Sequence, residues 1–195
     1  MHNIGVITDS HSGITQKQAE KLGIFVLPMP FYFDEKCYYE DVTLSREEFF
    51  EKLNSGRKAA TSQPSLADVM KLWNEGLKQF EQIVYLPISS GLSGSCASAQ
   101  ALAKDAPYKG RVYVVDNGRV STPLHRAVLD ALELVEEGYQ AKEIKEILEQ
   151  ARDKMVIYVA VETLVHLKNG GRISPATAAL GTVLNIKPVL KFDVG

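Results

Sequence analysis

Hydroxyl side chains gather in short loops that follow apolar, strand-like runs. The densest example is LPISSGLSGSCASAQ, residues 86–100, where an apolar run ends at Ile88 and a helical pattern follows. Three further loops are rich in small polar residues: TDSHSG (8–13), ATSQPS (60–65) and DNGRVST (116–122). Some of these hydroxyls are explained by helix capping. Small residues also let the backbone approach a ligand, and hydroxyls with helix N-terminal N–H groups bind oxyanions, so we expect a carboxylate or phosphate here.

The absence of nucleotide-binding motifs narrows the kinds of anion that this site could bind. The sequence has neither a G-x-x-x-x-G-K-[ST] phosphate loop nor a G-x-G-x-x-G turn, which disfavours a nucleotide. An anionic group on a smaller or more apolar molecule remains. Neither metal-ligand spacing nor a pair of catalytic carboxylates is present, so we expect no metal.

A serine hydrolase is an alternative. Ser93 lies in GLSGS, which departs from the G-x-S-x-G nucleophile motif at Ser95. His11, His125 and His166 are the candidate bases, although each is more often structural than catalytic. Ester hydrolysis is therefore weakly supported.

A second distinctive stretch is KNGGRIS, residues 168–174. Gly170 and Gly171 permit a sharp turn, from which Arg172 projects. Arg172 is either a solvated surface arginine, or its guanidinium group pairs with an anion on a ligand or on a partner protein.

The elements that must position these loops alternate along the chain. Apolar runs predict strands at 3–10, 82–89, 111–116 and 155–161, with helices predicted at 12–23, 45–56, 64–80, 93–103, 121–138 and 141–154. The segment 24–40 reads as a strand and an extended excursion, and Pro28 and Pro30 suit an edge or a bulge. Continuously apolar strands alternating with helices predict an α/β fold with a parallel sheet flanked by helices.

Two domains are expected. Residues 1–161 form the N-terminal α/β domain. Residues 162–195 read as a short helix, a glycine-rich turn, a second helix and one strand, which is the beginning of a second, incomplete α/β domain.

Composition indicates an ordinary globular protein. The 195 residues are 45% hydrophobic with a net charge of −2, which gives no reason to expect nucleic acid or an anionic membrane as a partner. Cys37 and Cys96 suggest reduced, buried thiols. The chain shows neither a signal peptide nor a long apolar segment, so we expect a cytoplasmic protein without stable membrane insertion.

Together the motifs resemble those of the DegV family, bacterial fatty-acid-binding proteins. The matching stretches occur in the family's order along the whole chain: ITDS (7–10), TSQPS (61–65), ISSGLSGS (88–95), VVD (114–116), ETLVHLKNGGRIS (162–174) and LNIKPVL (184–190). TSQPS and LKNGGRIS together are highly specific.

The resemblance implies one long-chain fatty acid held between two domains. It places Thr61 and Ser93 on the carboxylate and Arg172 by the head group, and the same motifs bring Ser62, Gly94 and Ser10 to the site. It implies a lipid carrier and not an enzyme, with no catalytic residue and no cofactor besides the bound fatty acid. The partner it implies is the ATP-binding subunit of a fatty acid kinase, which makes an acyl-phosphate for phospholipid synthesis.

Several positions depart from the family pattern. His11 and Ser12 are unusual but are expected to matter little. Cys96 with Ala97 predicts altered packing beside the head group, and residues 117–119 predict an altered loop near it. Family members also continue past this chain, and the family's head-group histidine lies in that part, so none of the four histidines is assigned to it. A truncated remnant without ligand is therefore a third possibility.

Overall fold

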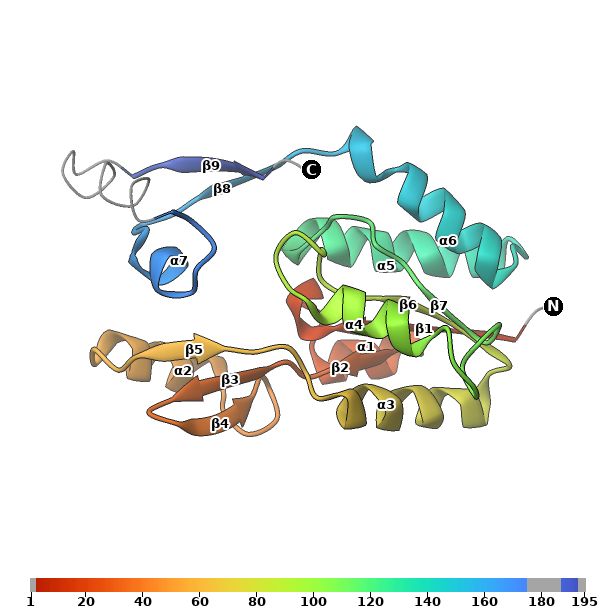
Figure 1. Cartoon of the computed structure of the whole chain (residues 1–195), viewed down its shortest axis with the longest axis horizontal. Coiled ribbons are helices and arrows are strands. Elements are labelled where there is room, and N and C mark those ends of the chain that lie inside the picture. The colour runs from red at the N-terminus through yellow and green to blue at the C-terminus, as the bar shows by residue number, and fades with distance from the viewer. Residues whose placement is uncertain (1–2, 175–186, 193–195) are drawn as a thin grey trace.

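A four-stranded parallel sheet forms the centre of the computed structural model, which describes residues 3–174 and 187–192 (Figure 1). Its strands are, in spatial order, β2 (Phe25–Leu27), β1 (Ile4–Asp9), β6 (Gln82–Leu86) and β7 (Val112–Val114). β1 pairs with both β2 and β6 in parallel. The predicted α/β fold with a parallel sheet flanked by helices is confirmed.

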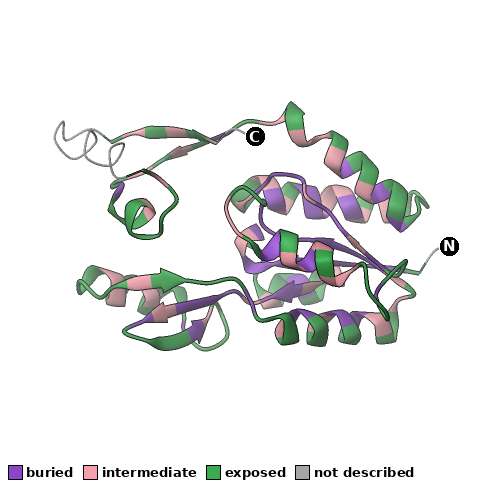
Figure 2. Cartoon of the chain, in the orientation of Figure 1, coloured by how far each residue is buried: buried purple, intermediate pink, exposed green. Residues whose placement is uncertain are grey.

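Alternating side chains of the strands build a separate core on each face of this sheet. On one face Val6 and Val84 pack with helices α1 (Gln16–Leu22), α5 (Ser121–Glu136) and α6 (Ala141–Gln150). On the other, Ile7 and Ile83 pack with α3 (Leu66–Gln79) and α4 (Ser95–Leu102). Figure 2 shows the resulting buried strands between half-exposed helices. Because both faces are covered, the strands need apolar residues at consecutive positions.

Local signals set several helix ends. Ser45 and Glu48 form a capping box at the start of α2 (Arg46–Asn54), with the Glu48 N–H donating to Ser45 Oγ (3.2 Å) and the Ser45 N–H to the Glu48 carboxylate (2.9 Å). α1 ends before Gly23, close to the end of the predicted helix over 12–23, and the φ of this glycine, 67°, lies in the left-handed region that glycine favours.

A second sheet, antiparallel, was not predicted. It consists of β4 (Lys36–Tyr39), β3 (Pro30–Phe33) and β5 (Ala59–Thr61), and it packs with α2 around the aromatic residues Phe31, Phe33 and Tyr38. We call β3, β4, α2 and β5 the aromatic lobe. The chain enters the lobe after β2 and leaves it between β5 and α3. The predicted excursion over 24–40 is thus a strand of the main sheet followed by a hairpin.

The C-terminal part of the described chain lies apart from the parallel sheet (Figure 1). After the short helix η2 (Arg152–Lys154), β8 (Ile157–Ala160) pairs antiparallel with β9 (Val189–Phe192), and α7 (Val165–Asn169) is the predicted short helix. The predicted domain boundary at residue 161 stays a prediction, with one strand of this pair on each side of it. The second helix predicted after Ser174 lies outside the described residues.

Two other expectations can be compared with the structure. Cys96 is buried as predicted, but Cys37 is exposed, because it sits on β4 at the edge of the small sheet and points away from the aromatic core. Among the described residues no helix has the length and apolarity that a bilayer crossing needs.

Candidate functional site

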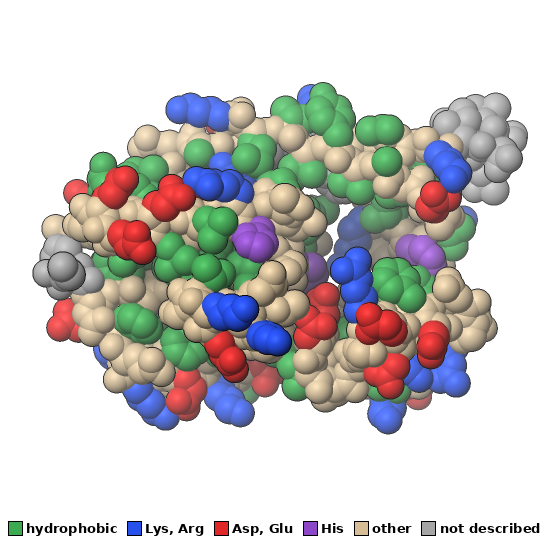
Figure 3. All heavy atoms as spheres, turned by 180° about the vertical axis from the view of Figure 1, so that it is seen from behind, with side chains coloured by type: hydrophobic (Ala, Val, Ile, Leu, Met, Phe, Trp, Pro, Cys, Tyr) green, Lys and Arg blue, Asp and Glu red, His purple; other side chains and the backbone are tan. Residues whose placement is uncertain are grey.

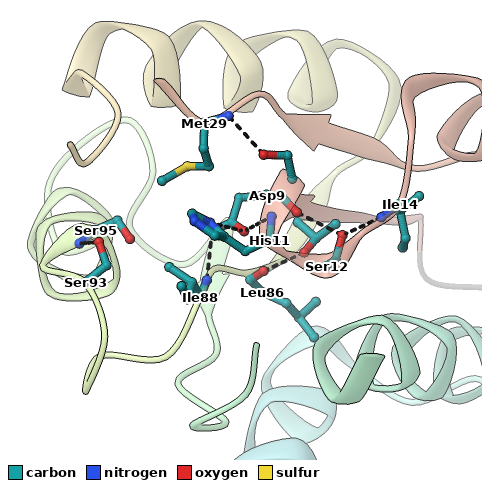
Figure 4. Close-up of polar contacts among 11 residues, drawn as sticks. Asp9, His11, Ser12, Ile14, Met29, Leu86, Ile88, Ser93 and Ser95 are labelled. Atoms are coloured by element: carbon teal, nitrogen blue, oxygen red, sulfur yellow. Dashed lines mark hydrogen bonds and ion pairs between the residues drawn. The ribbon is translucent and has the colours of Figure 1, made fainter. Parts of the chain in front are cut away.

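The loops after β1 and β6 meet where the order of strands reverses. From β1 the chain proceeds to β2 on one side, and later to β6 on the other, so the carboxyl ends of β1 and β6 flank a switch point, the usual ligand position in such sheets. Asp9, fully buried, joins the two loops: its Oδ2 accepts the Ile88 N–H (2.8 Å) and its Oδ1 the His11 N–H (3.0 Å) (Figure 4). One carboxylate therefore fixes both loops.

Ser10 connects this point to the segment that leads from β2 into the aromatic lobe. It begins the short helix η1 (Ser10–Ser12), is 8% exposed, and its Oγ accepts the Met29 N–H (3.2 Å) (Figure 4). The structure thus gives Ser10 a positioning contact beside the site. Direct binding of a ligand by Ser10 stays a prediction.

The serine loop after β6 is supported by the loop after β7. The Ser89 N–H donates to the Arg119 carbonyl (2.9 Å), and the Ser90 N–H to Asp116 Oδ1 (3.3 Å). Arg152 Nη1 donates to the other Asp116 oxygen (2.6 Å). Burial would raise the pKa of Asp116, but the bonds from Ser90 and the charge of Arg152 outweigh it and hold the pKa below its ordinary value. The altered loop at 117–119 is therefore a neighbour of the site.

Ser93 and Gly94 lie at the start of α4. Ser93 is half-buried, and its Oγ accepts the Ser95 N–H (3.2 Å). A Cβ added to Gly94 would come within 3.0 Å of Gln63 Oε1, and that oxygen also accepts a bond from Ser98 Oγ (3.4 Å). Glycine thus allows the loop after β5 to reach α4.

Thr61 is the last residue of β5, and Ser62 begins the loop that follows it. Both are exposed, and the Ser62 hydroxyl donates to the Gln63 carbonyl (3.1 Å). The contacts of Gln63 therefore bring the segment Thr61–Gln63 next to Gly94 and Ser98, although 35 positions separate Gln63 from Ser98. The roles of Thr61, Ser62 and Ser93 toward a ligand stay predictions.

His11 lies in η1, directly after β1, and its ring contacts Asp9. The expectation from the sequence that this residue matters little stays a prediction. The Nδ1 atom of His11 is 3.2 Å from Asp9 Oδ1. Figure 4 shows the ring between Met29 and Ile88, on the side of the chain that carries Ser93 and Ser95. Burial lowers the pKa of His11, but the hydrogen bond and charge of Asp9, helped by Glu40, raise it above the ordinary value, against an opposing effect of Arg172. The preceding Asp9, two positions away, is the local signal that could have indicated a held histidine.

Arg172 reaches the same region from the far end of the chain. It follows the predicted tight turn, in which Gly171 has φ 73°, and its Nη1 donates to the Gly170 carbonyl. The side chain is exposed, and its charge lies close enough to lower the pKa of His11. The structure therefore brings Arg172 towards His11, and its pairing with an anion stays a prediction.

A hollow separates the parallel-sheet part from the aromatic lobe and the C-terminal strands (Figure 3). Histidine and basic side chains are visible along its wall, among apolar side chains. This distribution suits an anionic group attached to an apolar molecule.

The serine hydrolase alternative has part of the geometry that it requires. Asp9 and His11 form the carboxylate–imidazole half of a catalytic triad. Within residues 3–174 and 187–192, however, no hydrogen bond joins a histidine to Ser93, whose Oγ instead accepts the Ser95 N–H. The same residues contain no cluster of three metal-ligating side chains.

Comparison with known proteins places the chain in a family. The model of the DegV family, described as uncharacterised proteins, matches residues 3–195. The chain belongs to the DegV family. Protein DegV of Bacillus subtilis is 34% identical over 194 residues, covering 98% of this chain and 68% of that protein. A DegV domain-containing protein of Deinococcus radiodurans is 35% identical over 189 residues, covering 96% of this chain and 66% of that protein.

Solved DegV structures share the fold. A DegV family protein from Thermus thermophilus, described by its fatty acid binding, has a TM-score of 0.85 and 36% identity, covering 98% of this chain and 68% of that one. DegV of B. subtilis, described as a fatty acid binding protein, has a TM-score of 0.83 and 32% identity, covering 99% and 69% respectively.

Proposed function

We propose that this DegV protein binds a long-chain fatty acid and presents it to a separate, ATP-binding fatty acid kinase subunit. Thr61 and Ser93 hold the carboxylate, with Ser62, Gly94 and Ser10 shaping the loops and Arg172 near the head group. The observation that carries the proposal is the approach of the Thr61–Gln63 loop to Gly94 at the switch point of the sheet. The fatty acid binding of DegV relatives supports the same ligand.

The physical roles of head and tail differ. A charge-assisted hydrogen bond to a carboxylate contributes about 1.5–3 kcal/mol. A dozen buried methylenes contribute on the order of 10 kcal/mol before the costs of association. The hydroxyl loops therefore orient the ligand, and burial of the tail supplies most of the affinity.

The proposed kinase step divides the chemistry between two proteins. The γ-phosphoryl group of ATP is transferred to a carboxylate oxygen, which yields an acyl-phosphate and ADP. This sequence has no nucleotide-binding motif, so the ATP site belongs to the partner. In a reconstituted assay, acyl-phosphate trapped with hydroxylamine should require ATP, kinase subunit and this protein together.

Native mass spectrometry tests ligand binding directly. Protein purified from bacterial cells should carry the mass of a C14–C18 fatty acid, the range that the family resemblance suggests. The Thr61→Ala/Ser93→Ala variant should lose it. Thr43→Ala/Ser55→Ala is a matched control, because in the described part of the chain these exposed hydroxyls bond to Tyr39 and Lys52, next to or within the aromatic lobe.

A ligand-free mass that persists after incubation with palmitate would overturn the proposal and support a folded chain without ligand. An acyl mass retained equally by both double variants would instead contradict the assignment of Thr61 and Ser93.

Hydrolysis is the second candidate, favoured only by the Asp9–His11 pair. It predicts turnover of p-nitrophenyl esters that disappears in Ser93→Ala. Because no histidine is hydrogen-bonded to Ser93 among the described residues, we expect no turnover above that of this variant.

A further inference from the structure

The two ring nitrogens of His11 differ in their contacts: Nδ1 contacts Asp9, and Nε2 is the nitrogen that a ligand could reach. Nδ1 faces Asp9 Oδ1 at 3.2 Å, while the backbone N–H of the same residue is held by that oxygen at 3.0 Å. Nε2 has no hydrogen-bond partner among residues 3–174 and 187–192. The side chain is 32% exposed, so its unpaired edge can reach a ligand. Asp9 therefore fixes the tautomer and the orientation of the ring.

The charged groups around the ring come from three parts of the chain. Asp9 lies at the end of β1, Glu40 follows β4, and Arg172 follows α7. The two carboxylates favour a protonated ring, and the guanidinium disfavours it. A protonated His11 and Arg172 repel one another, and an anion placed between them would relieve that repulsion.

We propose that His11 is a third head-group residue of this chain, whose Nε2–H donates to the carboxylate held by Thr61 and Ser93, so that fatty acid binding retains a proton on His11. The inference rests on the proposed function. His11 comes from the loop of β1 and Ser93 from the loop of β6, so both sides of the switch point contribute to the head group.

A proton shared in this way makes affinity depend on pH. The bound carboxylate favours imidazolium, so the pKa of His11 is higher in the complex than in the free protein. Affinity is then constant below the free-protein pKa. It falls by up to about tenfold per pH unit between the two pKa values, and levels off above the higher one.

Fluorescence titration with 11-(dansylamino)undecanoic acid between pH 6 and 9 measures this dependence. The native protein should lose affinity on the order of tenfold or more across the range. His11→Gln keeps an amide N–H donor but cannot titrate, so its affinity should be nearly flat with pH. His125→Gln, which removes a histidine of α5 that forms no hydrogen bond with His11, Thr61 or Ser93 in the described chain, should follow the native protein.

A second measurement uses only the native protein. The His11 ring is titrated by NMR with and without saturating palmitate, and the ligand should raise its pKa. An unchanged pKa, or identical pH profiles for native protein and His11→Gln, would overturn the inference while leaving fatty acid binding intact. Failure of the native protein to bind either ligand at any pH would overturn both the inference and the proposed function.

Discussion

Replacing Asp9 by asparagine removes a buried charge that serves three donors: two N–H groups of the backbone and the His11 ring. We expect Asp9→Asn to lower the free energy of unfolding by about 2–4 kcal/mol, because the new amide cannot accept at both former oxygens and the donors lie near or in the core. Urea unfolding followed by circular dichroism measures the change.

Asp34→Asn is the matched control for this variant. Asp34 pairs with Arg57 at the surface, with both side chains at least half exposed, so its loss should change stability by less than about 0.5 kcal/mol. Equal effects of the two substitutions would contradict the structural role given to Asp9.

The two cysteines should differ sharply in reactivity. Burial raises the pKa of the Cys96 thiol to about 12, whereas Cys37 is exposed on β4. A thiol-reactive disulfide reagent at pH 8 should modify one thiol rapidly, and the second only after unfolding. The rapid phase should vanish in Cys37→Ser; two rapid thiols in the native protein would contradict the burial of Cys96.

For single residues, the sequence patterns identified the hydroxyl-rich loops of the candidate site, but not the part that each residue in them plays. The hydroxyl clusters of 60–65 and 86–100 are visible as patterns, but Thr61 and Ser93 were selected by family resemblance. The surroundings of His11 could not be predicted, because they depend on the contact of Asp9 with Ile88, 79 positions away. No local periodicity encodes such a contact.

At the scale of elements, the Asp116–Arg152 pair ties the loop after β7 to η2, the short helix that follows α6. Because the pKa of Asp116 is below its ordinary value of 3.8, the pair's contribution to stability is fully present above pH 3.8. It is lost as the pH falls through the folded-state pKa.

Asp116→Asn should therefore flatten the acid dependence of the urea midpoint between pH 2 and 5. Asp34→Asn should retain the native dependence, and a native-like curve for Asp116→Asn would contradict the role of this pair.

The elements of the parallel sheet were predictable because each strand is apolar at consecutive positions and each helix has an apolar stripe. The hairpin of the aromatic lobe was not. Its two-residue turn, Asp34–Glu35, has φ values of 49° and 69°, a conformation for which Asn-Gly is the recognisable sequence signal. β5 has only three residues, too few for a periodic pattern. The same features explain why the exposure of Cys37 was missed.

At the scale of the whole molecule, the aromatic lobe has a core of its own. Phe33 is 1% exposed and its cluster shares no residue with the cores of the parallel sheet. Phe33→Ala should destabilise the lobe by about 3–5 kcal/mol. Hydrogen exchange should accelerate in β3, β4 and β5 but not in β1 or β6, and fatty acid binding should weaken because Thr61 ends β5.

Phe50→Ala is the control for the lobe, since Phe50 is 46% exposed. It should leave exchange in β3 and β5 close to native. Uniform acceleration across both sheets in Phe33→Ala would show that the two parts unfold together and would contradict an independent lobe.

The loops of the site are tied by bonds that the protein makes with itself: Asp9 to Ile88, Ser90 to Asp116 and Ser89 to Arg119. These loops are therefore preorganised, so that little backbone entropy is lost when a carboxylate head group binds. The proposed carrier would load and unload many times. Because these loops would not have to be rebuilt in each cycle, successive acyl chains would be offered to the proposed partner in one and the same orientation.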